Sequence, residues 1–181
     1  MADTTMRPTV AGSLRGANVI LDATDPARDL YAQGRYGTML SGGRVQLTLY
    51  ETAYLAERGR IAVTDARGRP LDQDRLLRAG ARLEKAFRTK YAVFSDLRAR
   101  GYTVKTALKY GADFRVYGRG VKPGEGHAKW IVYPVHESGA MTWYDLAAKN
   151  RVAHSTRKRL LLAIVDDEGD VTYLETAWTR P

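Results

Sequence analysis

The sequence predicts an α+β fold made of a small N-terminal α/β domain and a second domain with a central mixed sheet flanked by helices. The chain of 181 residues is long enough for one large or two small domains. Its 44% hydrophobic and 27% charged residues are ordinary for a globular protein. Short β-rich segments and helical segments alternate between glycine-rich turns along the chain. We predict domains at residues 1–85 and 86–181, with residues 1–16 as a flexible lead-in.

The first domain is predicted from alternating strand and helix patterns. A strand over residues 18–22 precedes a short helix over residues 26–33, and extended segments follow at residues 36–40 and 44–47. Thr48 with Glu51 three residues later forms a capping box that opens a second helix. Gly59 ends that helix, and a strand follows over residues 61–64.

The second domain is predicted to begin within a helical region. One helix is expected over residues 72–88 and another over residues 91–100. Thr142 with Asp145 caps a further helix that extends to about His154. The remaining strands are expected at residues 103–106, 113–117, 128–134, 160–166 and 170–176.

The net charge of +9 indicates a polyanionic partner, most simply a nucleic acid, although a basic surface without a specific role is the alternative. Residues 81–181 hold 18 Lys and Arg against 11 Asp and Glu, so most of the excess lies in the second half. The absence of cysteine excludes disulfides, thiolate catalysis and zinc-finger ligation. No apolar run approaches the roughly 18 residues that span a bilayer, and the N-terminus lacks the apolar core of a signal peptide. We therefore expect a cytoplasmic protein with no membrane partner.

Three residues of the basic half could cleave RNA without a metal ion. Such cleavage needs a base for the 2′-hydroxyl, an acid for the leaving 5′-oxygen and a cation for the charge on phosphorus. His127 suits the acid and Lys158 the cation. Tyr117 could serve as the base if the surrounding cations Arg115, Arg119 and Lys158 favour its phenolate. The alternative is that the tyrosine packs, the histidine is structural and the lysine belongs to a solvated basic face.

Other functions remain possible on the residues alone. Asp113 and Glu125 could hold Mg²⁺ in a metal-dependent nuclease, although a two-metal site needs more carboxylates. The loop over residues 118–126 is rich in glycine but lacks the spacing of a phosphate-binding loop. A basic module that binds nucleic acid without cleaving it is a further alternative. We expect no metal and no cofactor.

Three segments together resemble the archaeal tRNA-splicing endonuclease family. They are YGADFRVYGRG, GHAKWIVYPV and RVAHSTRKRLLLAIVDDEGDVTYLE, and YGTMLSGGRVQLTLYETAYLAERGRI in the first half is similar to the family's N-terminal domain. The resemblance extends from about Asn18 to Glu175. It implies that Tyr117, His127 and Lys158 are the general base, the general acid and the stabiliser of the transition state.

The resemblance also implies a substrate and an assembly. The substrate is precursor tRNA, cut at its exon–intron junctions within a bulge–helix–bulge element. The assembly has four subunits, either a homotetramer or a heterotetramer of two plus two, which the sequence does not distinguish. Arg151 best matches the family arginine that stacks on a bulge base, with Trp178 or Tyr173 as its partner. The resemblance further implies that the acidic turn over residues 166–170 is a loop that inserts into a basic pocket of a facing subunit. It also implies that the strand over residues 171–176 could pair with its counterpart in a neighbouring subunit. A non-catalytic RNA-binding or assembly subunit is the alternative.

Overall fold

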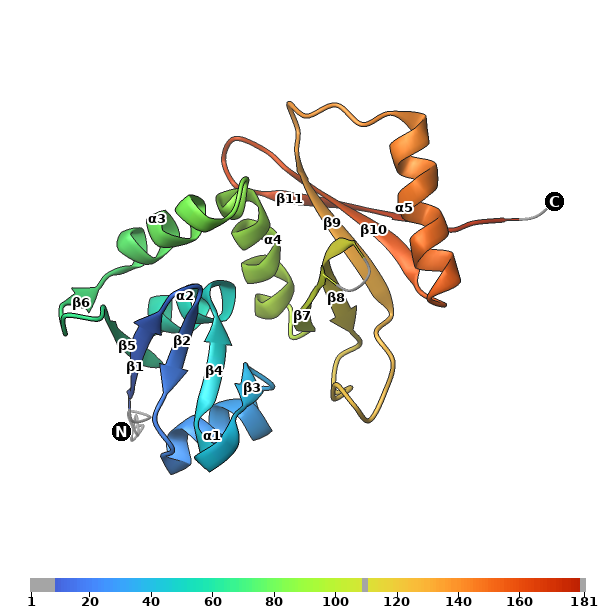
Figure 1. Cartoon of the computed structure of the whole chain (residues 1–181). Helices are drawn as coiled ribbons and strands as arrows, with labels where there is room; N and C mark the ends of the chain where they lie inside the picture. The colour runs from blue at the N-terminus through green and yellow to red at the C-terminus, as the bar shows by residue number, and fades with distance from the viewer. Residues whose placement is uncertain (1–8, 109–110, 180–181) are drawn as a thin grey trace, which may run out of the picture. The chain divides into compact units, whose positions relative to one another are not determined.

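The computed structural model describes residues 9–108 and 111–179. The chain divides into two compact units, and the boundary falls between Phe87 and Arg88 (Figure 1). The boundary that the sequence indicated, after residue 85, lies two residues earlier. No helix within the described residues is both long enough and apolar enough to cross a membrane.

The first unit is built on a six-stranded sheet with the order β3-β4-β2-β1-β5-β6. Only β1 and β5 are parallel among the paired strands, and the other pairs are antiparallel. The strands are β1 (Val10–Arg15), β2 (Asn18–Leu21), β3 (Thr38–Met39), β4 (Val45–Thr48), β5 (Ile61–Thr64) and β6 (Pro70–Leu71). The helices are α1 (Asp25–Ala32), α2 (Leu49–Glu57) and α3 (Gln73–Leu83).

Strand β1 corrects the prediction of a flexible lead-in over residues 1–16. It pairs with β2 on one side and with β5 on the other, so it lies inside the sheet. Gly12 interrupts the apolar pattern that would predict a strand here. A Cβ at this position would come within 2.7 Å of the Leu21 side chain and 2.8 Å of the Val19 side chain. The close approach of these two side chains therefore requires glycine, which sequence patterns associate with loops. Residues 1–8 of the predicted lead-in lie outside the described residues.

The capping box of α2 is present as predicted. The Thr48 hydroxyl accepts a hydrogen bond from the Glu51 amide, and the Glu51 carboxylate accepts one from the Thr48 amide at 3.0 Å. Glu51 is buried, and its second carboxylate oxygen accepts a bond from the Gly37 amide at 2.8 Å. This residue thus ties the start of α2 to the loop before β3, which accounts for a carboxylate in the core.

The predicted helix over residues 72–88 was wrong at its end. Helix α3 stops at Leu83, and α4 (Phe87–Ala99) starts after a sharp turn in which Ala86 has a φ of 57°. Packing explains the break, because Tyr50 stacks on Phe87 with ring centroids 4.5 Å apart and donates a hydrogen bond to Glu84. These partners are more than 30 residues away in the sequence, so no local signal indicated the turn.

The second unit holds a five-stranded mixed sheet with the order β11-β10-β9-β8-β7 (Figure 1). Its strands are β7 (Thr103–Ala107), β8 (Ala112–Tyr117), β9 (Trp130–His136), β10 (Arg159–Val165) and β11 (Val171–Thr176). The parallel pair β9 and β10 is joined through α5 (Trp143–Ser155), because parallel neighbours need a crossover connection. The predicted α+β class, with a mixed sheet and helices in the second unit, is confirmed.

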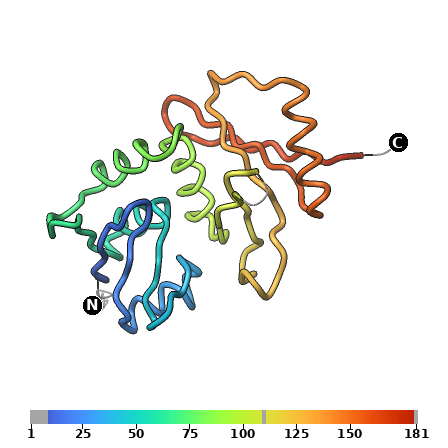
Figure 2. Tube along the Cα trace, in the orientation of Figure 1, coloured from blue at the N-terminus to red at the C-terminus, as the bar shows by residue number. Residues whose placement is uncertain are grey.

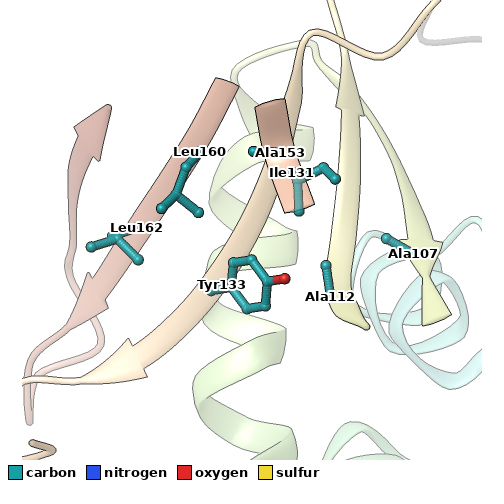
Figure 3. Packing of buried hydrophobic residues seen from close by; sticks show 7 residues of the cluster. All are labelled: Ala107, Ala112, Ile131, Tyr133, Ala153, Leu160 and Leu162. Carbon is teal, nitrogen blue, oxygen red and sulfur yellow. The ribbon is translucent and has the colours of Figure 1, made fainter. Parts of the chain in front are cut away.

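Helices α4 and α5 pack against the sheet to form the hydrophobic core of this unit. Phe94 of α4 packs on Phe114 of β8, with ring centroids 5.9 Å apart. Helix α5 packs on β10, and Ala153 of this helix joins a buried cluster on the sheet (Figure 3). The other buried members of that cluster are Ala107, Ala112, Ile131, Tyr133, Leu160 and Leu162. The C-terminal end of α5 is thereby anchored close to the start of β10.

Candidate active site

Three neighbouring strands place the predicted catalytic residues at one end of the second sheet. Val116 of β8 pairs with Trp130 of β9, and Trp130 pairs with Arg159 of β10. The paired residues Val116, Trp130 and Arg159 form a row across the three strands. Tyr117 follows Val116 and Lys158 precedes Arg159, so Tyr117 and Lys158 each lie one residue beyond that row, at the same end of the sheet. Only β9 separates their strands, which places their backbones about 10 Å apart, or two strand spacings. The backbone of Lys129 lies between them, since its amide donates to Val116 and its carbonyl accepts from Arg159, so a substrate would contact Tyr117 and Lys158 through their side chains at this end of the sheet.

Tyr117 is the last residue of β8 and is buried, with 5% of its surface exposed. It pairs in register with Thr103 of β7, which fixes its backbone on the side away from β9. The guanidinium of Arg115 lies 5.9 Å from the centre of the Tyr117 ring. Arg119, which the sequence also brings near Tyr117, donates instead to the carbonyl of Arg100 at 2.9 Å.

His127 lies at the end of the connection that leads into β9. This connection leaves the sheet after Tyr117 and returns at the same end of the sheet (Figure 2). The chain turns through Gly120 and Gly124, which have φ values of 80° and 96°, so the loop depends on glycine for its path. His127 is exposed and forms no hydrogen bond with another described residue. Its imidazole is accordingly open to a substrate.

Lys158 stands in the turn between α5 and β10. Its amide donates to the carbonyl of Ala153 at 2.8 Å, and its Nζ donates to the carbonyl of Thr156 at 2.7 Å. Arg157 has a φ of 56°, which lets the chain reverse directly after the helix. The half-buried lysine is thus held by the backbone at the helix end and not left on a freely solvated face.

Arg151 is exposed on α5, three residues before His154. The His154 ring meets Trp178 edge to face, with ring centroids 4.4 Å apart. Residues three apart are neighbours on a helix surface, so Arg151 lies next to this aromatic pair. Of the two stacking partners considered for Arg151, Trp178 is therefore the one that contacts a helix neighbour of this arginine.

Tyr173 has a different role. Its hydroxyl donates to the carboxylate of Asp96 on α4 at 2.7 Å, and Arg100 lies 5.7 Å from the centre of its ring. Burial, followed by the hydrogen bond to Asp96 and the charge of that carboxylate, raises the pKa of Tyr173. This tyrosine holds α4 to β11 and is engaged in the fold of the unit.

A polar network that the sequence did not predict borders the same end of the sheet. The indole of Trp130 donates to Glu175 of β11, and Arg159 forms an ion pair with the same carboxylate. The hydrogen bond from Trp130, followed by that from Arg159, lowers the pKa of Glu175. Trp130 and Glu175 are 45 residues apart, so only the pairing of β9, β10 and β11 shows that they meet.

The lowered pKa of Glu175 predicts part of the acid sensitivity of the fold. Its folded pKa lies below the ordinary value of 4.5, so its stabilising effect is complete above pH 4.5 and is lost as the pH falls through the lower value. We expect the free energy of unfolding of Glu175→Gln to change less between about pH 6.5 and pH 3.5 than that of the wild type. Urea unfolding at both pH values measures this difference. Equal pH dependence in the two proteins would contradict it, and Glu137→Gln controls for loss of an exposed glutamate directly after β9 in the same unit.

The carboxylates considered as metal ligands have other partners. Asp113 forms an ion pair with Lys90 at 2.5 Å, and Glu125 pairs with Lys122 in the loop at 3.4 Å. These contacts favour structural roles for both carboxylates over a magnesium site.

The acidic turn between β10 and β11 is an exposed hairpin turn. The Asp166 carboxylate accepts hydrogen bonds from the amides of Glu168 at 3.0 Å and Asp170 at 2.8 Å. Asp167 faces the ring of His136 at 3.2 Å. Its side chain keeps 86% of its surface exposed, so the turn presents negative charge to solvent.

Comparison with known proteins identifies the family. The model of the tRNA intron endonuclease N-terminal domain matches residues 10–77, and that of the tRNA intron endonuclease catalytic C-terminal domain matches residues 87–173. The tRNA-splicing endonuclease of Thermococcus kodakarensis is 40% identical over 92% of this chain and 96% of its own. The chain belongs to the tRNA intron endonuclease family. The tRNA-splicing endonucleases of Methanothermobacter thermautotrophicus and Pyrococcus furiosus are 40% and 39% identical over 95% and 97% of this chain, and over 99% of their own.

Membership in the tRNA intron endonuclease family confirms the resemblance seen in the sequence. The match to the catalytic domain spans Tyr117, His127 and Lys158, and the chain carries both domains of the family. The protein is therefore an endonuclease of tRNA splicing. The non-catalytic subunit considered as the alternative is not favoured.

Proposed function

We propose that this chain cuts precursor tRNA at its exon–intron junctions, within a bulge–helix–bulge element, by attack of a 2′-hydroxyl on the adjacent phosphate. The observation that carries the proposal is the placement of Tyr117 and Lys158 on either side of β9, at the end of the sheet to which the His127 loop returns. A base, an acid and a cation at one edge are the groups that metal-independent cleavage needs.

Each of the three side chains has one role in the cleavage reaction. The phenolate of Tyr117 removes the proton from the 2′-hydroxyl, and the 2′-oxygen forms a bond to phosphorus. The bond from phosphorus to the 5′-oxygen breaks, and the imidazolium of His127 gives its proton to that oxygen. Lys158 offsets the additional negative charge on the phosphorane. The products are a 2′,3′-cyclic phosphate and a 5′-hydroxyl, and the proton lost by the nucleophile balances the proton gained by the leaving group.

Arg151 and Trp178 support recognition of a bulge. A planar guanidinium and an indole near one another offer two flat surfaces for an unpaired base. Both residues are exposed, and His154 positions the indole by its edge-to-face contact. We assign the stacking of a bulge base to this pair.

The surface of the second unit supports assembly into four subunits. β11 is an edge strand of the sheet, and Leu174 on it is 49% exposed, as suits edge-to-edge pairing with a second subunit. The exposed acidic turn before β11 suits insertion into a basic pocket of a facing subunit. A homotetramer and a two-plus-two heterotetramer both use these contacts, and the mass of the active particle in solution distinguishes them.

The first test is cleavage of a bulge–helix–bulge RNA by the purified chain alone, in EDTA with monovalent salt. We expect two cuts that leave cyclic phosphate and 5′-hydroxyl ends, because none of the proposed steps uses a metal ion. Cleavage that EDTA abolishes would contradict the mechanism. Binding without cleavage, unchanged when a candidate partner subunit is added, would favour the non-catalytic alternative.

A further inference from the structure

We propose that a groove on the first unit binds phosphates of the precursor RNA, at a site separate from the cleavage residues. The inference rests on the proposed function, since it takes RNA as the substrate. The groove has a volume of about 470 Å³ and lies where α3 meets the turn between β5 and β6. Four arginines line it, Arg69, Arg75, Arg78 and Arg82, and Asp65 is the one carboxylate among the residues in its lining.

The arginines follow one face of a helix. Arg75, Arg78 and Arg82 are spaced three and four residues apart, so they lie on the same side of α3. At 1.5 Å per residue, the first and last are about 10 Å apart along the helix axis. Arg69 completes the row from the adjoining turn. The result is a line of guanidinium groups, which suits a polymer with regularly repeated charges.

Local ion pairs orient these side chains without covering them. Arg69 pairs with Asp65 and Arg78 pairs with Asp74, each at 2.7 Å. Even so, the side chains of Arg69, Arg75 and Arg78 keep 65%, 53% and 57% of their surface exposed. A guanidinium has five N–H donors, so one carboxylate leaves donors for a further anion. The groove therefore presents oriented donors and an excess of positive charge.

Arginine in place of lysine favours phosphate as the ligand. The planar fork of a guanidinium bonds two phosphate oxygens at once, whereas an ammonium acts as a point charge. The residues from 65 to 82 hold five arginines, three aspartates and no lysine. The lining has no aromatic side chain on which a base could stack, so the expected contact is with the backbone of the RNA and is independent of base sequence.

The test measures RNA binding over a salt series. The RNA is a precursor transcript with 2′-deoxy nucleotides at both cleavage positions, so that it binds without being cut. We expect Arg78→Ala and Arg82→Ala each to weaken binding and to lower the slope of log affinity against log salt by about one. Arg28→Ala is the matched control, because Arg28 is also an exposed, aspartate-paired helical arginine of the first unit, outside the groove. We expect Arg28→Ala to keep the wild-type slope.

Three further measurements separate the alternatives. Unchanged melting temperatures show that the groove variants fold, and an unchanged cleavage rate at saturating RNA shows that the catalytic site is intact. Equal salt slopes in groove and control variants would overturn the inference. A reduced particle mass in the groove variants would also overturn it, since the groove would then hold an acidic segment of another subunit. A wild-type chain that fails to cut RNA even when a candidate partner subunit is added would contradict the proposed function alone, because the salt slopes test the groove independently.

Discussion

Replacement of His127 by alanine is expected to lower the single-turnover rate of RNA cleavage by about 100- to 10,000-fold, the range typical for loss of a general acid. The leaving 5′-oxygen would then depart without a proton. The affinity for RNA should stay close to that of the wild type, because His127 is exposed and makes no hydrogen bond to another described residue that its loss would disturb. Single-turnover kinetics with excess enzyme, together with binding to uncleavable RNA, separate the two effects.

His136→Ala is the control for this experiment. His136 is the last residue of β9, at the opposite end from the proposed site, and it contacts Ser138 at 2.8 Å. Because its ring also faces Asp167 of the acidic turn, the particle mass of the variant is measured first, and at unchanged mass we expect its cleavage rate to match the wild type. Equal losses in the two histidine variants, or a His127→Ala protein that folds but no longer binds RNA, would refute the role of His127 as the acid.

Replacement of Lys158 by alanine is expected to lower the cleavage rate by about 100- to 1,000-fold, the usual cost of removing one stabilising group from a transition state. The variant also leaves the Thr156 carbonyl without its 2.7 Å bond from Nζ, which should cost about 1 kcal/mol of stability. Rate and urea stability must therefore be measured on the same preparation. A rate loss at temperatures where the variant is fully folded is assigned to the chemistry.

Lys149→Ala provides the comparison for Lys158. Lys149 also belongs to the α5 region, where its ammonium lies 4.5 Å from the centre of the Tyr133 ring. Its removal changes the net charge equally, so a general electrostatic effect on RNA binding should appear in both variants. Only Lys158→Ala should slow the reaction at saturating RNA. Similar rates in the two variants would show that Lys158 acts through overall charge.

The predictions from sequence succeeded where the signal was local. The capping boxes at Thr48 and Thr142 each start a helix, because their bonds join residues only three apart. They failed at Gly12 and Ala86, where contacts with residues distant in the sequence determine the backbone conformation. The side chains of Leu21 and Val19 leave no room for a Cβ at Gly12. The contacts of Tyr50 with Glu84 and Phe87 fix the turn that contains Ala86.

The candidate site shows the same division. Residue types and spacing identified Tyr117, His127 and Lys158 as a possible set, because base, acid and cation are properties of individual side chains. Their placement at one end of the sheet depends on β9 lying between β8 and β10, and on α5 returning the chain to that end. The tertiary structure is likewise needed to see that Trp130 bonds to Glu175, and that Arg69 lies beside the arginines of α3. The sequence by itself determined the available chemistry, and the strand order, set by burial of apolar faces across the whole chain, decided which groups meet.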